Sequence, residues 1–223
     1  MTDATPTGCT VDFKKEYRDL YSLKKGPAII DVPAMNFVAV TGKGNPNDEN
    51  GDYQQAVGLL YAIQYTIKMS KKGTSIPDGY FDYVVPPLEG LWWFDGNGKH
   101  ENVQTPPKDK SKYNWISIIR LPEYVNKKVF DWACKEVQSK KKLNTDKAQF
   151  FKLKEGLCVQ CLHIGSFDDE HITMKLIEQF ITENGLVIDI NDVRRHHEIY
   201  MADARKVEAG KMKTILRIPV RKK

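Results

Sequence analysis

Apolar residues recur along the chain with two different spacings. Over residues 53–70 they lie three and four positions apart, which predicts an amphipathic helix. The same spacing predicts helices over residues 12–22, 122–143 and 169–184. Apolar runs rich in β-branched and aromatic residues predict the strands, because such side chains pack well on a pleated surface. The predicted strands span residues 29–32, 37–43, 80–85, 88–94, 115–121, 157–164, 195–202 and 213–220.

The series strand, helix, strand, strand occurs twice. Residues 118–122 (IIRLP) end the first series, and the similar residues 215–219 (ILRIP) end the second. A repeated unit predicts a pseudo-twofold pair, and the seam between the copies is a natural place for a ligand cleft. We therefore expect an α+β fold, in which helices pack on one face of an antiparallel sheet.

The repeat also predicts the domain limits. An N-terminal segment of residues 1–34 contains the short helix, and residues 35–223 form the repeated domain. Repeat one spans about 35–122, the linking helix about 123–143, and repeat two about 150–220. Because the linking helix has an apolar side and each copy alone has a small core, we expect one compact unit rather than two independent domains.

Composition and charge limit the classes of function. The chain has 223 residues, of which 41% are hydrophobic, and a net charge of +5. Its basic residues are scattered rather than gathered on one element beside aromatic residues, so we expect no nucleic-acid partner. No stretch approaches the roughly 18 consecutive apolar residues of a membrane span, and residues 1–10 lack the apolar segment of a secretory signal. We therefore expect a cytoplasmic protein without a membrane partner, and the oligomeric state stays open.

The cysteines do not predict a metal site. Cys158 and Cys161 have the spacing of a metal-binding pair, but side chains three apart on a strand point to opposite faces. The sequence has no second pair of this kind. We expect these thiols to be buried as small apolar groups, and we expect no metal and no cofactor.

Two glutamates lie in the middle of corresponding strands beside aromatic residues. Glu89 precedes Trp92 and Trp93, and Glu198 precedes Tyr200. Glutamate is disfavoured in strands and costly to bury without a partner. An exposed sheet face or a salt bridge to an arginine would account for either glutamate alone. For the two together, we expect both carboxylates to point into a shared aromatic cleft.

Several aromatic residues near these glutamates are candidate walls of the cleft. Alternation along the strand places His196, Glu198 and Tyr200 on one face. Trp92 and Trp93 point to opposite faces, so at least one ring needs a partner other than the core, and a flat ligand is a candidate.

Three roles stay open for Glu198. It can pair with a cationic ligand beside aromatic rings, act as a general base toward water, or be hydrogen-bonded within the core. The residues alone do not choose among these roles. Tyr61 and Tyr65, one helical turn apart, are likewise either core residues or walls of a ligand site.

Two segments resemble a known protein family. Residues 196–203 (HHEIYMAD), followed by 211–220 (KMKTILRIPV), resemble the C-terminal signature of the GyrI-like small-molecule-binding family. Residues 80–93, with the core LEGLWW, resemble the first-repeat signature of its stand-alone members. The resemblance extends over about 35–220 and implies a duplicated pair of SHS2-type modules with a ligand cleft between them. The family's DNA-reading regulators carry an additional DNA-binding module, for which the segment before the first repeat is too short.

The resemblance also implies a reaction. Some stand-alone members of the family are similar to cyclopropanoid hydrolases, which detoxify DNA-alkylating compounds of the yatakemycin and duocarmycin type. This similarity implies that an activated cyclopropane is opened by addition of water. Glu198 would be the base, Tyr200 a hydrogen-bond donor or water-orienting group, and Glu89 the second carboxylate. The ligand-binding residues would be Trp92, Trp93, Tyr61, Tyr65 and His196.

A non-catalytic role is the alternative that the resemblance implies. In the multidrug-responsive regulators of the family, the glutamate that matches Glu198 meets cationic drugs inside an aromatic cavity. The protein would then bind and sequester hydrophobic, aromatic or cationic small molecules, or modulate gyrase. Formation of a hydrated product from a cyclopropane-bearing compound distinguishes the two functions.

Overall fold

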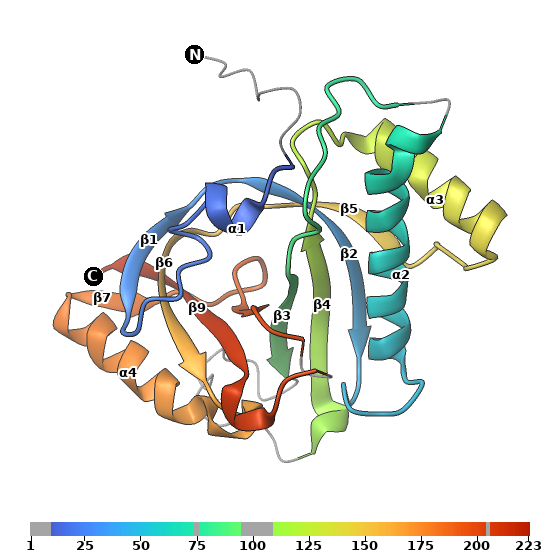
Figure 1. Cartoon of the computed structure of the whole chain (residues 1–223). Helices are drawn as coiled ribbons and strands as arrows, with labels where there is room; N and C mark the ends of the chain where they lie inside the picture. The colour runs from blue at the N-terminus through green and yellow to red at the C-terminus, as the bar shows by residue number, and fades with distance from the viewer. Residues whose placement is uncertain (1–9, 74–75, 95–108, 204–205) are drawn as a thin grey trace.

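The computed structural model describes residues 10–73, 76–94, 109–203 and 206–223. The α-helices in these residues are α1 (Phe13–Glu16), α2 (Asp52–Lys68), α3 (Lys127–Lys141) and α4 (Glu170–Glu183). The strands are β1 (Ala28–Val32), β2 (Met35–Lys43), β3 (Leu88–Phe94), β4 (Tyr113–Arg120), β5 (Ala148–Leu153), β6 (Gly156–Ile164), β7 (Leu186–Ile188), β8 (His196–Tyr200) and β9 (Lys213–Lys222). Figure 1 shows their arrangement. No helix in the described residues is long and apolar enough to span a membrane.

The strands form an antiparallel sheet, so the predicted α+β class is confirmed. Their order is β1-β6-β9-β8-β3-β4-β2-β5, and β7 pairs with β9. Outward from the seam between β3 and β8, the strands on one side are β3, β4 and β2, with β5 at the edge, and those on the other side are β8, β9 and β6, with β1 at the edge. The two halves follow the same order of elements along the chain, as a duplication would produce. The duplication itself stays a prediction.

The helices α2, α3 and α4 cover the same face of the sheet, which we call the helical face. Residues paired directly across antiparallel strands point to the same face. Glu198 pairs with Leu216, which belongs to the core under α4. Glu198 also pairs with Gly90, and Gly90 pairs with Ser117. Trp115, two residues from Ser117, belongs to the core under α2 and α3. Figure 1 accordingly shows α4 against one part of the sheet and α2 with α3 against another.

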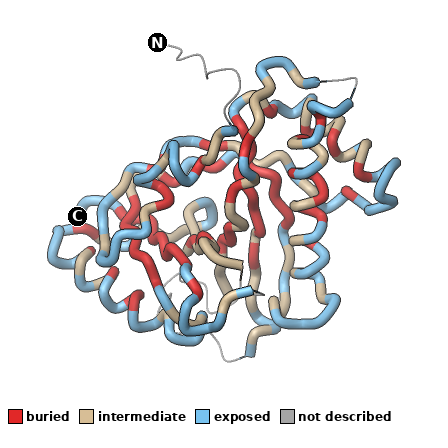
Figure 2. The backbone as a smooth tube through the Cα atoms, in the orientation of Figure 1, coloured by how far each residue is buried: buried red, intermediate tan, exposed pale blue. Residues whose placement is uncertain are grey.

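The opposite face of the sheet is covered by the N-terminal residues and by the segment before β3, and we call it the N-terminal face. Phe13, Leu20 and Tyr21 pack there against Tyr83 and the strand residue Phe37. These five side chains are buried. Figure 2 shows the buried backbone running along the central strands, between the two covers. The sheet therefore has a core on each face, and a side chain's face decides which core it meets.

One predicted strand is wrong. Residues 80–85 form no strand, and Tyr83 makes only an isolated bridge to Val11. Pro86 and Pro87 follow, and proline lacks the amide donor that a sheet ladder needs. The segment instead crosses the N-terminal face and buries the Tyr83 ring.

The predicted helix over residues 12–22 is shorter than expected. Asp12 caps α1 by accepting a hydrogen bond from the Lys14 amide, but the helix ends at Glu16. The chain then turns, which brings Leu20 and Tyr21 into the core. The structure also adds β7, a three-residue strand too short for its period to be recognised. Residues 101–112, whose polar, proline-containing sequence predicts a loop, lie largely outside the described residues.

The two cysteines with metal-pair spacing lie apart, as predicted. Cys158 belongs to the core of the N-terminal face, and Cys161 belongs to the core under α4. Both are buried and free. Burial raises the pKa of the Cys158 thiol to about 12, so this group is not a thiolate near neutral pH.

A network of charged side chains is buried on the N-terminal face. His197 Nε2 lies 2.9 Å from Glu89 Oε2, and His197 Nδ1 lies 3.0 Å from Glu155 Oε1. Arg217 Nη1 lies 2.9 Å from Glu155 Oε2, and its Nε donates to Gln160. Two carboxylates and two cations thus face one another away from water. This mutual pairing is required, because a buried charge without a partner is strongly destabilising.

The network makes stability depend on pH. Burial alone would lower the pKa of His197, but the charge and hydrogen bond of Glu155, together with Glu89, raise it to about 9. The unfolded value is about 6.5, so the stabilisation is fully present below about pH 6.5 and is lost as pH rises through about 9. We expect the free energy of unfolding, measured with denaturant, to fall by about 3 kcal/mol over this range.

A pair of variants assigns this loss to the network. Glu89→Gln removes one of the groups that raise the pKa of His197, so the loss between pH 6.5 and 9 should shrink. His163→Gln changes another buried histidine, one that bonds to Thr173 and to the Ser166 carbonyl, and should keep the wild-type loss. An undiminished loss in Glu89→Gln would contradict the assignment.

Candidate functional site

The helical face carries a cluster of polar and aromatic side chains at the seam between β3 and β8. Alternation along β8 turns His196, Glu198 and Tyr200 to this face. Across the seam, Gly90 lies opposite Glu198, and Trp92 lies opposite His196. A Cβ atom at position 90 would lie 2.5 Å from Trp92 Nε1 and 2.9 Å from the Tyr200 hydroxyl oxygen. Only glycine leaves the space in which these two groups meet.

Hydrogen bonds fix the orientation of Glu198. The Tyr200 hydroxyl donates to Glu198 Oε2 at 2.8 Å, and Trp92 Nε1 donates to the Tyr200 oxygen at 2.9 Å. The second carboxylate oxygen, Oε1, lies 3.2 Å from His196 Nε2. Burial, and then the charge of Glu198, raises the pKa of Tyr200 well above its usual range, so its hydroxyl stays a donor. The hydrogen bond from Tyr200 holds one oxygen of Glu198 in place. The Glu198 side chain is 13% exposed, so the carboxyl group still reaches water.

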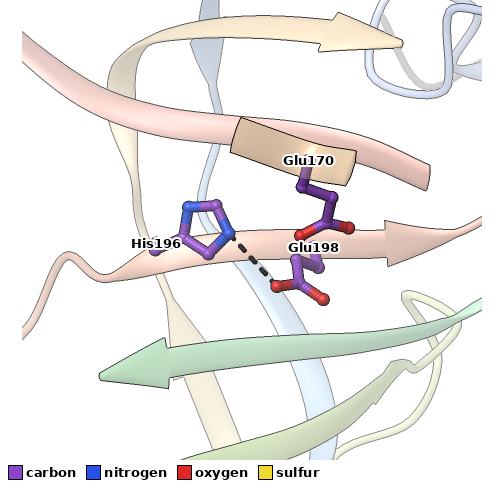
Figure 3. A group of neighbouring side chains, drawn as sticks. All are labelled: Glu170, His196 and Glu198. Atoms are coloured by element: carbon purple, nitrogen blue, oxygen red, sulfur yellow. Dashed lines mark hydrogen bonds and ion pairs between the residues drawn. The ribbon is translucent and has the colours of Figure 1, made fainter. Parts of the chain in front are cut away.

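A second carboxyl group, from Glu170, faces Glu198. Glu170 is the first residue of α4, and one ligand atom from each of Glu170, His196 and Glu198 lies within 4.8 Å of the others. Figure 3 shows the Glu170 side chain extending from α4 toward Glu198. Burial, followed by the charges of Glu198 and Asp168, raises the pKa of Glu170 well above that of an ordinary glutamate. This environment favours a neutral carboxyl group on Glu170.

Aromatic rings surround the carboxyl groups. Tyr53, in the first turn of α2, has its ring centroid 5.5 Å from that of Trp92. Tyr113 of β4 meets Trp92 at 6.1 Å, with the ring planes steeply inclined. Phe167, just before α4, meets Tyr200 edge-on at 5.8 Å and is 43% exposed. Burial raises the pKa of Tyr53 to about 12, so its hydroxyl is neutral. Such rings offer stacking surfaces to a flat apolar ligand.

The family of this chain follows from comparison with known proteins. The family model described as the GyrI-like small molecule binding domain matches residues 26–221. The chain belongs to this family. The resemblance inferred from residues 196–203 and 211–220 is thereby confirmed.

Solved structures similar to this GyrI-like domain support the assignment. A protein from Listeria innocua described as a hydrolase is 44% identical, covers 95% of this chain and 100% of its own, and has a TM-score of 0.85. An uncharacterized conserved protein from Listeria innocua is 45% identical, with the same coverage and TM-score. The C-terminal domain of EcmrR is only 11% identical, covers 88% of this chain and 98% of its own, and shares the fold at a TM-score of 0.52. No curated protein matches the sequence.

The expectation that Glu89 and Glu198 share one cleft is wrong. In the pairing of β3 with β8, Glu89 lies opposite Ile199, one residue beyond Glu198. A shift of one residue along a strand moves a side chain to the other face. Glu89 therefore lies in the buried network with His197, and its second oxygen accepts a hydrogen bond from Tyr21. The second carboxyl at the site comes from Glu170 instead.

The predicted ligand-binding residues divide between the two faces. Trp92 and His196 lie at the site, whereas Trp93 points to the N-terminal face, where the Arg195 guanidinium lies 4.5 Å from its ring centroid. Tyr61 and Tyr65 lie further along α2, with ring centroids 6.3 Å apart. Tyr65 is 48% exposed, and Tyr61 packs at the edge of the core under α2.

Four residues of the site escaped the sequence analysis: Glu170, Tyr53, Tyr113 and Phe167. Their shared feature is a position at the start of an element, where the period of apolar residues has not yet begun. A signal was present, because Glu170 and Tyr53 occupy the first turns of corresponding helices in the two halves. Residues in the first turns of helices that meet at the seam between two halves are therefore candidate site residues, as are residues of the central strands.

The close packing at Gly90 gives a test of the site's geometry. Gly90→Ala would force Trp92 and Tyr200 apart, so we expect the free energy of unfolding to fall by roughly 1–3 kcal/mol and the near-ultraviolet signal of the aromatic rings to change. Gly58→Ala is the control, because a Cβ atom at this exposed helical position meets nothing within 4 Å. It should stabilise the protein by about 0.5–1 kcal/mol. Equal effects of the two substitutions would contradict the described packing.

Proposed function

We propose that this GyrI-like domain is a detoxifying hydrolase that opens activated cyclopropanes of DNA-alkylating compounds by adding water. The observation that carries the proposal is the pair formed by Glu198 and Glu170. Two carboxyl groups from different elements face one another, and the pKa of one of them is raised. A pair of acids in different environments is suited to act as base and acid in one reaction.

The residues have distinct roles in this reaction. Glu198, oriented by Tyr200, accepts a proton from water, and the water oxygen forms a bond to the strained methylene carbon. The cyclopropane carbon–carbon bond breaks, and its electron pair moves through the conjugated ring to the carbonyl oxygen, which becomes a phenolate. Glu170, held neutral by its surroundings, donates a proton to that oxygen. The net change is the addition of one water molecule.

The aromatic residues support a flat conjugated substrate. Trp92 contacts both Tyr53 and Tyr113, and the half-exposed Phe167 lies next to Tyr200. Stacking on these rings would hold the substrate while the polar groups act on one edge of it. The similarity to a Listeria innocua protein described as a hydrolase, at 44% identity over nearly the whole chain, supports an enzyme over a passive binder.

One observation favours a second function, the binding of cationic compounds without reaction. Glu198 and the Trp92 ring lie on the same face, where a carboxylate and an aromatic surface together attract an organic cation. The two functions differ in what the Glu198 charge does. In the hydrolase it removes a proton, whereas in the binder it only pairs with the ligand.

The variant Glu198→Gln distinguishes these functions. Glutamine keeps the volume and accepts the Tyr200 hydrogen bond but does not accept a proton. We expect turnover of a cyclopropane-bearing duocarmycin-type compound, followed by mass spectrometry as the gain of one water, to fall by about 10²-fold or more. The matched control Glu183→Gln, at the exposed far end of α4, should keep wild-type turnover.

Two outcomes would contradict the hydrolase. The first is no hydrated product from the wild type. The second is Glu198→Gln turnover equal to that of the control. If, in addition, the variant loses affinity for cationic ligands but keeps affinity for neutral ones, the domain is the cation binder.

The role of Glu170 predicts a pH dependence. As a proton donor it must be protonated, so activity should fall as pH rises through its pKa, which lies above the ordinary glutamate value. Glu170→Gln does not titrate, so this alkaline fall should disappear and the plateau rate should drop by about 10²-fold. The measurement is kcat against pH for both proteins. An alkaline fall that persists unchanged in the variant would assign it to another group.

A further inference from the structure

The three polar side chains at the site also have the composition of a metal-binding set. His196 and Glu198 are two residues apart on one face of β8, and Glu170 approaches them from the start of α4. One ligand atom from each lies within 4.8 Å of the other two. Three ligand atoms at this separation require only small rotations to reach bond lengths of about 2.0–2.2 Å around a central ion. Figure 3 shows the three groups oriented toward a common region.

We propose that Glu170, His196 and Glu198 bind a single zinc ion. An imidazole nitrogen with two carboxylate oxygens is a ligand set that zinc accepts, and it leaves a fourth position open. Glu170 releases its proton to solvent when the ion binds. The imidazole argues against magnesium and calcium, which prefer oxygen ligands alone. Binding does not depend on the proposed hydrolysis, because it uses only the ligand atoms and their geometry.

Groups behind the ligands support the proposal. In protein metal sites, outer hydrogen bonds orient the ligands and contribute to affinity. Here Tyr200 donates to Glu198 Oε2, and Trp92 donates to Tyr200. Because Tyr200 occupies Oε2, the other oxygen of Glu198, Oε1, is the one directed toward the ion, and it faces His196. The same two donors that orient a base for water therefore also orient a ligand for a cation.

Two buried atoms of the cluster have no hydrogen-bond partner among the described residues. Oε1 of Glu170 is one of them, and a bound cation would supply its partner. The other is Nδ1 of His196. Ligating histidines usually donate their second ring N–H to a carboxylate, a carbonyl or water, and this support strengthens binding by about 10- to 100-fold. Without it from the described residues, we expect reversible binding rather than a permanently held ion.

The ion would occupy the place where the substrate water meets Glu198. Zinc bound to Glu198 Oε1 removes the proton acceptor, so zinc and hydrolysis would exclude each other. This consequence rests on the proposed function. We therefore expect micromolar zinc to inhibit the hydrolysis and a chelator to restore the rate.

Titration of metal-stripped protein with zinc, by calorimetry or against a chromophoric chelator, tests the binding directly. We expect one ion per chain with a micromolar dissociation constant. Glu170→Gln and His196→Asn should each weaken binding by about 10²-fold, and Tyr200→Phe by about 10-fold, because it only orients a ligand. His171→Asn, which changes the exposed histidine next to Glu170, should bind as wild type, and magnesium should not compete.

The results separate this proposal from the hydrolase. Zinc binding that is unchanged in both Glu170→Gln and His196→Asn, each shown to be folded by circular dichroism, would overturn the site. So would the absence of binding to the wild type. If the wild type hydrolyses the cyclopropane compound, added zinc should lower its rate, and a rate raised by zinc would overturn the inhibition. If no hydrolysis occurs, the titration still decides whether zinc binds.

Discussion

The antiparallel pairing of β3 with β8 is the interaction on which the rest of the structure depends. It joins the two halves of the sheet, and its register decides which side chains meet. With Gly90 opposite Glu198, the space above glycine accepts the Trp92 indole and the Tyr200 hydroxyl. A slip of one residue would turn Glu198 toward the N-terminal core and His197 toward the helices. The site and the buried network therefore require the same register.

The pKa values of buried carboxyl groups shift in opposite directions on the two faces of this seam. On the N-terminal face, His197 and Arg217 neutralise Glu155, and together they lower its pKa to about 2 despite the opposing effect of burial. On the helical face, Glu170 meets burial and the charge of Glu198, and its pKa rises. The first arrangement stabilises a fixed structure. The second leaves a proton and a charge available to a ligand, which is why we place the chemistry there.

Much of this arrangement was predictable from residue patterns. Alternation along β8 correctly placed His196, Glu198 and Tyr200 on one face, because the strand period does not depend on its neighbours. The error on Glu89 came from the register between β3 and β8, which the pattern of one strand does not contain. Glu170 was missed because its role comes from where α4 meets the sheet. Tertiary contacts of this kind can be predicted only when the fold is known, because the pattern of one element does not contain them.

The domain's central feature is the pair of carboxyl groups that face one another, and the titration of Glu170 is the most direct test of it. Carbon-13 labelling of the glutamate carboxyls and nuclear magnetic resonance would follow Glu170 against pH in the wild type and in Glu198→Gln. The wild-type Glu170 should titrate well above the ordinary value of about 4.3. Its pKa should move down in the variant, because the charge of Glu198 is one of its causes, while burial should keep part of the rise. A Glu170 that titrates at the ordinary value, with no response to Glu198→Gln, would show that the two groups do not form one site.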